Sequence, residues 1–176
     1  MGKKIIFSLI LTLIFSIPLF SYQSDKVFKK FDYSIANTDA KTFLEFVEEY
    51  KELDEKVKLD FRLKQSNLIK ILNFEKKLFE YGPTDTLYSV HIKIKKMLSN
   101  NTELGEVIDE LFSDFFIKNM KTSLCVLEGI QNEEDYNILV NSIVFVEGAA
   151  KKILKFIEES GLKNKAYYKT FIKYKS

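Results

Sequence analysis

Few side chains in this 176-residue chain are of the types that catalysis or metal binding usually needs, since it has one histidine, His91, and one cysteine, Cys125. Metal motifs of the His-Glu-x-x-His and Glu-x-x-His kinds need imidazoles and carboxylates one helical turn apart. The residues that precede His91 are Tyr88, Ser89 and Val90, so neither motif is present. No nucleophile elbow, phosphate-binding glycine loop or dinucleotide fingerprint occurs. We therefore assign no catalytic residue, no metal site and no cofactor.

A Cys–His pair made of Cys125 and His91 is the nucleophilic arrangement that the sequence leaves open, because the fold decides which distant residues meet. The simpler interpretation is a half-buried helix histidine and an unrelated core cysteine, since Cys125 lies in the apolar stretch 124–127. Carboxylates are plentiful, but they follow the pattern of solvated helix faces with lysine partners one turn away. We expect a protein that is not an enzyme.

The N-terminus has the pattern of a secretory signal peptide. Lys3 and Lys4 precede an apolar run over residues 5–20, which is interrupted by three hydroxyl residues and Pro18. This run is shorter than the about 20 residues that a membrane-spanning helix needs. The sequence predicts a signal peptide at residues 1–21 with a cut after Ser21, and a retained N-terminal anchor is the alternative. The mature chain is expected to be exported to the periplasm or the cell surface, with no transmembrane span.

Helical periodicity dominates the chain from Asp39 onward, where apolar residues recur at steps of three and four. The stretch 39–81 has no Gly or Pro and is too long for one helix of a small domain, so we expect a break near 54–56 or near 65–67. Residues 84–98 fit a helix, although the middle of this segment also alternates like a strand. We favour a helix because no second strand is available to pair with it.

The remaining helices have recognisable ends. Asn101 or Thr102 and then Asn132 are expected as N-caps, and Gly161 as a left-handed C-cap. Residues 132–160 are expected to form one long helix, preceded by a helix that is kinked at Thr122-Ser123.

These patterns predict an all-α fold. We expect a compact helical bundle of about four to six amphipathic helices, folded as a single domain over residues 22–176. Residues 22–37 show no clear period and are expected to be an irregular lead-in with at most one helical turn.

Charge is distributed unevenly along the chain. Residues 102–150 hold 2 basic and 10 acidic side chains, whereas residues 151–176 hold 8 basic and 2 acidic ones. The C-terminal tail, residues 162–176, interleaves lysines with aromatic residues, a pattern typical of surfaces that bind anionic membranes, acidic glycans or nucleic acid. The alternative, which we favour, is that the tail docks on the bundle and covers its acidic helices. The candidate partner-binding residues are Lys163, Lys165, Tyr167, Tyr168, Lys169, Phe171, Lys173 and Tyr174.

Together these features favour an exported, non-enzymatic helical protein of the bacterial cell envelope or surface that acts as an interaction module. Its partner would be an unknown protein or an anionic envelope or surface component, and no nucleic acid is expected. A periplasmic carrier or chaperone that binds apolar ligands between its helices is the alternative, because the chain is rich in phenylalanine. An enzyme is the third hypothesis, and it would need His91 or several carboxylates to converge in a cleft.

Overall fold

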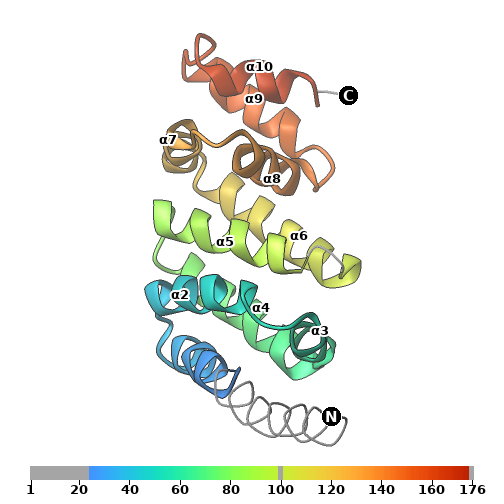
Figure 1. Ribbon diagram of the computed structural model, residues 1–176. Helices are drawn as coiled ribbons and strands as arrows, with labels where there is room; N and C mark the ends of the chain where they lie inside the picture. Colours follow the sequence, from blue (N-terminus) through green and yellow to red (C-terminus); the bar gives the residue numbers. More distant parts are fainter. Residues whose placement is uncertain (1–23, 99–100, 175–176) are drawn as a thin grey trace, which may run out of the picture. The chain divides into compact units, whose positions relative to one another are not determined.

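The computed structural model describes residues 24–98 and 101–174 (Figure 1). Every regular element within these residues is a helix, which confirms the predicted all-α class. The described residues form nine helices after a helical segment at residues 24–37, more than the four to six that we expected. None of these helices is both long and apolar enough to cross a membrane. The predicted signal peptide at residues 1–21 and its cut lie outside the described residues.

The chain divides into two compact units, Met1–Leu63 and Lys64–Ser176. That residues 22–176 fold as one domain stays a prediction. In the first unit, residues 24–37 are helical, which corrects the irregular lead-in expected for residues 22–37. The reason is a short apolar stripe, because Val27 and Phe31 are buried one helical turn apart.

Two further helices complete the described part of the first unit, α2 (Ala40–Lys51) and α3 (Glu55–Leu63). Asp39 caps α2 by accepting a hydrogen bond from the backbone N–H of Thr42. The interruption at residues 52–54 agrees with the break expected near 54–56.

Phe61 of α3 lies at the centre of an aromatic cluster in the first unit. Its ring centroid is 5.0–5.7 Å from those of Phe28, Phe31, Phe46 and Tyr50. The phenol of Tyr50 is buried in this cluster and donates a hydrogen bond to the carbonyl oxygen of Lys58, at 3.0 Å.

The second unit contains seven helices among its described residues. They are α4 (Gln65–Phe79), α5 (Asp85–Met97), α6 (Thr102–Lys118), α7 (Met120–Gly129), α8 (Glu133–Val144), α9 (Ala149–Glu159) and α10 (Ala166–Ile172). The break expected near 65–67 falls just before α4, and α5 confirms the helix expected within residues 84–98.

Several sequence-based cap assignments are confirmed. Asn101 accepts a hydrogen bond from the N–H of Leu104 at the start of α6, and Asn132 caps α8 in the same way. Gly161 follows α9 with a φ of 69°. The N–H of Leu162 returns to the carbonyl oxygen of Ile157 at 3.0 Å, as in a Schellman motif.

Two expected helix boundaries are wrong. The chain breaks at Asn119, between α6 and α7, rather than at Thr122-Ser123. The single long helix expected over 132–160 is divided into α8 and α9, because the chain turns over residues 145–148 and Gly148 adopts a φ of 78°. Glycine occupies this left-handed conformation without the steric penalty that a side chain brings.

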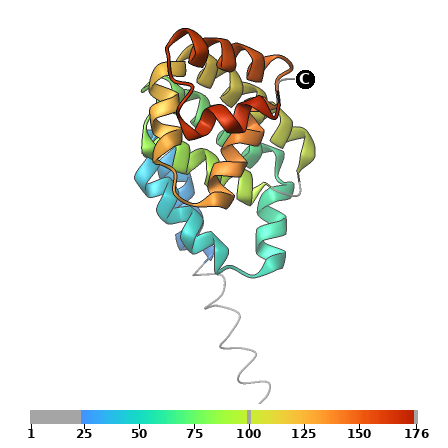
Figure 2. The ribbon, with the colours of Figure 1, turned by 90° about the horizontal axis from the view of Figure 1, so that it is seen from above.

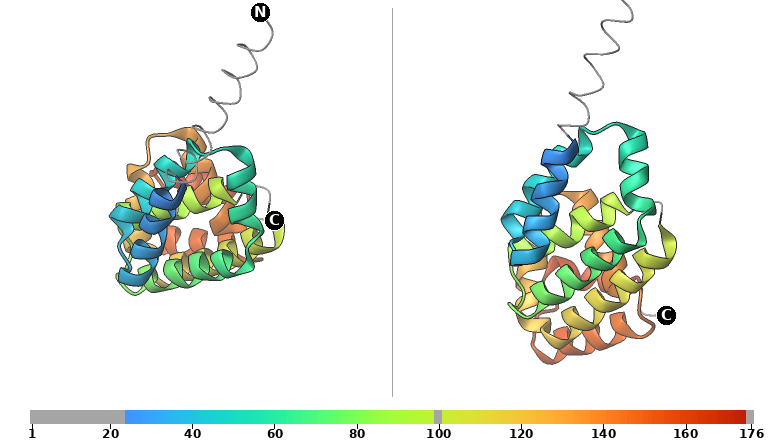
Figure 3. Two further views of the ribbon diagram at one scale, coloured as in Figure 1. Left: turned by 60° about the horizontal axis from the view of Figure 1, so that its bottom comes forward. Right: turned by 90° about the horizontal axis from the view of Figure 1, so that it is seen from below.

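Within the second unit, helices pack on consecutive and on more distant helices of the chain, and the most extensive contact joins α6 with α8. α4 and α5 lie side by side (Figure 3), α4 also contacts α6, and α5 contacts α8. α6 packs against α8 and α9, and α10 packs on α9 and α7 at the end nearest the viewer in Figure 2. The four helices α4, α5, α6 and α8 therefore meet around one region of this unit.

Candidate functional site

A buried pair of hydrogen-bonded side chains lies where α4 meets α5. The Nδ1 atom of His91, on α5, is 2.6 Å from Oε1 of Glu75, on α4. The side chain of His91 is 0% exposed and that of Glu75 is 1% exposed. Water therefore does not screen this contact, and each group depends on its protein neighbours for polar partners.

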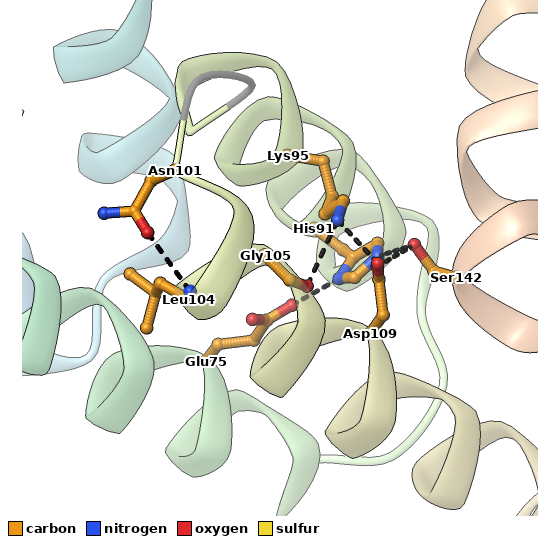
Figure 4. A network of polar contacts seen from close by, with 8 residues as sticks. All are labelled: Glu75, His91, Lys95, Asn101, Leu104, Gly105, Asp109 and Ser142. Carbon is orange, nitrogen blue, oxygen red and sulfur yellow. Dashed lines mark hydrogen bonds and ion pairs between the residues drawn. The ribbon is translucent and has the colours of Figure 1, made fainter. Parts of the chain in front are cut away.

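The contact extends into a chain of polar side chains that reaches α6 and α8 (Figure 4). The other ring nitrogen of His91, Nε2, is 2.9 Å from Oγ of Ser142 on α8. The Ser142 hydroxyl donates to Oδ1 of Asp109 on α6, at 2.5 Å. The Lys95 amine, one turn after His91 on α5, donates to Oδ2 of Asp109 at 2.7 Å. We call these five side chains the polar relay: Glu75, His91, Ser142, Asp109 and Lys95.

Local packing fixes the relay in place. The ring of Phe112 on α6 stacks on the imidazole of His91, with centroids 3.8 Å apart and an interplanar angle of 16°. The Lys95 amine also donates to the carbonyl oxygen of Gly105 at 3.2 Å. These contacts correct the expectation of a half-buried His91, whose imidazole is fully enclosed and has a partner on each ring nitrogen.

One end of the relay faces a pocket of about 480 Å³ between α5, α6 and α8. The relay contributes Lys95, Asp109 and Ser142 to its wall. The remaining lining residues are Lys96, Leu98, Asn101, Thr102, Gly105, Glu106, Glu134, Ile138 and Asn141. The relay therefore connects a solvent-accessible pocket with the buried Glu75.

Some charged side chains of the pocket have ion-pair partners among the described residues, and one does not. Lys95 is paired with Asp109, and the Lys96 amine lies 2.8 Å from Asp135 and 3.2 Å from Glu134. The hydrogen bond to Asp135 is the main reason why the pKa of Lys96 is raised. Glu106 is exposed, and the structure gives it no ion pair with any described residue. Both lysines of the pocket are thus held by carboxylates, whereas one carboxylate is open to a ligand.

The relay resembles a hydrolytic triad in the order of its atoms, with Ser142 on one ring nitrogen and a carboxylate on the other. The surroundings of Ser142 do not suit a nucleophile. Its hydroxyl proton is donated to Asp109 rather than to His91. Ser142 also lies inside α8, where backbone N–H groups are used in helical hydrogen bonds and cannot form an oxyanion hole. The geometry therefore supports a positioned polar wall rather than acyl transfer.

No family model, no curated protein and no solved structure matches this chain. Among residues 24–98 and 101–174, no group of three or more His, Cys, Asp or Glu side chains is arranged to hold a metal ion.

The predicted partner-binding residues of the tail fall into two groups. Tyr167 and Phe171, on α10, are 3% and 0% exposed. The ring of Phe171 lies 6.4 Å from that of Phe116, so α10 is anchored in the core of the second unit. This burial corrects the assignment of Tyr167 and Phe171 as partner-binding residues, because a partner cannot reach them while α10 is docked.

The other tail residues lie nearer the surface. The Lys165 amine is 2.9 Å from Glu128, and the Lys163 amine is 3.8 Å from Glu158. The Tyr168 hydroxyl also donates to Glu158, at 3.1 Å. The exposed tail residues that have no ion pair among the described residues are Lys169, Lys173 and Tyr174. Anion binding by this surface stays a prediction.

Cys125 is exposed on α7, which corrects its expected burial. Since both ring nitrogens of His91 are occupied by Glu75 and Ser142, the structure does not bring His91 and Cys125 together as a dyad.

The sequence pattern does not predict Glu75, Lys95, Asp109 or Ser142 as site residues. The one sequence feature that could have indicated such residues is a polar residue at a position where the helical pattern expects a buried apolar one. Glu75, for example, lies one turn after the buried Ile71 and one turn before the buried Leu78. A charged residue in such a stripe needs a partner, but the sequence does not say which one.

Proposed function

We propose that this protein is an exported, non-enzymatic binding protein of the bacterial cell envelope or surface, and that its pocket between α5, α6 and α8 receives a positively charged group. The group would be an amine or a guanidinium, carried by a small molecule or by a lysine or arginine of a partner protein. The observation that carries the proposal is the pocket of about 480 Å³ at the end of the polar relay.

The charge of the pocket favours a cation. Glu106, Asp109 and Glu134 contribute three carboxylates, and both lysines of the pocket already have carboxylate partners. The segment 102–150, which supplies α6 and α8, holds 10 acidic and 2 basic side chains. With two lysines also in its lining, the pocket carries one net negative charge. A concave surface with a net charge attracts ligands of the opposite sign.

The rigidity of the wall also supports a binding role. Asp109 is held by both Ser142 and Lys95, so its carboxylate has a defined direction before any ligand arrives. A group that is already oriented loses less conformational entropy on binding.

This site gives less support to the two other hypotheses, a carrier or chaperone for apolar ligands and an enzyme. The pocket is lined mainly by polar and charged side chains, which do not suit the apolar ligand of a carrier or chaperone. An enzyme that used Ser142 would need an oxyanion hole, and its position within α8 does not favour one.

The test is a titration of the purified protein with lysine amide, with a short lysine-containing peptide and with glutamate, followed by NMR shift changes. We expect the two cationic probes to perturb signals from α5, α6 and α8, and glutamate to have no such effect. Lysine amide alone would indicate a small-molecule site, and much tighter binding of the peptide would indicate a protein partner.

Two matched variants decide whether the pocket is responsible. Glu106→Gln removes a pocket carboxylate, whereas Glu103→Gln removes an exposed carboxylate of α6 that does not line the pocket. We expect several-fold weaker binding of lysine amide by the first variant and little change in the second. Equal effects of both variants, or equal binding of glutamate and lysine amide, would contradict the proposal.

A further inference from the structure

The polar relay needs one hydrogen for each of its contacts. Ser142 has a single hydroxyl hydrogen, and it is donated to Asp109. The 2.9 Å contact between Ser142 and His91 must therefore be filled by a hydrogen on Nε2 of the imidazole. The 2.6 Å contact between His91 and Glu75 needs a second hydrogen, on Nδ1 or on the carboxyl group.

A neutral imidazole beside an ionised Glu75 cannot supply both hydrogens. Such a histidine carries a hydrogen on only one ring nitrogen. The other nitrogen, either Nδ1 beside Glu75 or Nε2 beside Ser142, then directs its lone pair at a lone pair of the neighbouring oxygen. A relay with a hydrogen in every contact therefore contains one more proton than a neutral imidazole and an ionised Glu75 supply. The Glu75–His91 pair shares this additional proton.

Charge balance leads to the same result independently. With the additional proton, the pair is neutral overall, and Asp109 is balanced by Lys95. Without the proton, the 1% exposed Glu75 would be an uncompensated buried carboxylate. Buried charges without a partner are strongly unfavourable, and a group in this position neutralises instead.

We infer that the Glu75–His91 pair holds a proton at neutral pH, and that release of this proton increases the affinity of the pocket for cations. The second part of this inference rests on the proposed function. When the proton passes to the solvent, Nε2 of His91 becomes an acceptor, and the Ser142 hydroxyl turns to it. Asp109, which lines the pocket, then loses the donor to its Oδ1 atom.

The charged groups around the imidazole, on each helix that packs against it, are consistent with an affinity for cations that increases when the proton is released. α4 contributes Glu75, α6 contributes Asp109 through Ser142, and α5 itself contributes Lys95 at the far side of Asp109. Phe112 covers one face of the ring and carries no charge. Since binding and proton release are linked reciprocally, a bound cation should in turn promote loss of the proton.

The first experiment observes His91 directly, because it is the single histidine of the chain. Heteronuclear NMR of the labelled imidazole reports whether each ring nitrogen carries a hydrogen. At a pH of about 7.5, where an exposed histidine is mostly neutral, we expect a hydrogen on Nε2 and a second one on Nδ1 or on the Glu75 carboxyl, whose carbon shift reports its protonation. A Nε2 atom with a free lone pair, or a single hydrogen in the whole pair, would overturn the inference at this pH, whether or not the pocket binds a cation.

The second experiment measures the affinity for Nα-acetyl-lysine amide, whose single amine stays charged, across the pH range about 6 to 9, on both sides of the ordinary histidine value. We expect affinity to rise with pH, by at most about tenfold per unit for one released proton. Glu75→Gln should abolish this dependence, because the glutamine amide can donate to Nδ1 of a neutral His91. The control Glu80→Gln changes an exposed carboxylate at the end of α4 and should retain the dependence.

The two failures are distinguishable. Loss of all cation binding, with the additional proton still observed on the Glu75–His91 pair, would overturn the proposed function and the coupling, but not the protonated pair. A pH-independent affinity in the unmodified protein would overturn the coupling while the binding site stands.

Discussion

The hydroxyl oxygen of Ser142 lies 2.5 Å from Oδ1 of Asp109, and this hydrogen bond joins α8 to α6 beside the pocket. Ser142→Ala would leave Asp109 and Nε2 of His91 without their shared partner. Unsatisfied buried polar groups cost about 1–3 kcal/mol. We expect a loss of that size in the free energy of unfolding, measured by urea denaturation.

Ser113→Ala provides the matched control, because the Ser113 hydroxyl donates to the carbonyl oxygen of Ile143 at 2.7 Å and also joins α6 to α8. This variant should lose stability, yet leave the NMR signals of His91 unchanged, whereas Ser142→Ala should shift them. Identical His91 spectra in the two variants would mean that Ser142 does not act through the relay.

Tyr50 makes the first unit sensitive to alkali. Burial raises the pKa of its phenol from 10.0 to about 12. A raised pKa in the folded state means that the neutral phenol is favoured there, so this stability is present below a pH of 10.0 and declines as the pH rises towards about 12. We expect Tyr50→Phe to remove this part of the pH dependence, as measured by urea denaturation at several alkaline pH values. Equal losses of unfolding free energy at alkaline pH in the unmodified protein and in the Tyr50→Phe variant would contradict this expectation.

The sequence predicts local features of this fold better than distant contacts. Asn101, Asn132 and Gly161 were identifiable because a cap depends on residues within one turn of it. The break at Asn119 was missed, since nothing in its immediate neighbourhood requires the helix to end there. The relay was missed for a different reason. Its members come from four helices, and a pattern of single residues does not show which helix faces meet.

Two glycines should respond oppositely to alanine. Gly161 has a φ of 69°, which costs a residue with a side chain about 1–2 kcal/mol. Gly105 lies within α6, and an added Cβ would meet the flexible end of Lys95 at 3.4 Å. We therefore expect Gly161→Ala to lower the melting temperature, and Gly105→Ala to raise it through a gain of up to about 1 kcal/mol in helix propensity. A destabilised Gly105→Ala would show that Lys95 cannot adjust.

The docking of α10 depends on its apolar residues rather than on its charges. Phe171 is 0% exposed, so Phe171→Ala should cost about 3–5 kcal/mol in unfolding free energy. Lys165 is paired with Glu128 on the surface, and Lys165→Ala should have little effect because water screens such pairs. Thermal denaturation of both variants measures the difference. If the two substitutions were equally damaging, ion pairs rather than burial would hold the helix.

A truncation at Gly161 is therefore an unsuitable test of anion binding by the tail, since it removes buried residues as well as charges. Paired substitution of Lys169 and Lys173 retains the packing of Tyr167 and Phe171. Binding of the double variant to anionic vesicles, compared with that of the unmodified protein, measures the tail's electrostatic contribution alone.

The contact between His91 and Ser142 has a kinetic consequence, because it joins residues that are 51 positions apart in the chain. Contacts between consecutive helices of the second unit, such as those of α4 with α5 and of α9 with α10, close only short loops, and such local contacts form early in folding. A contact that closes a long loop is expected to form after the folding transition state. Disruption of the relay should then accelerate unfolding while leaving the refolding rate nearly unchanged. The relay would determine how long the second unit stays folded, rather than how fast it folds.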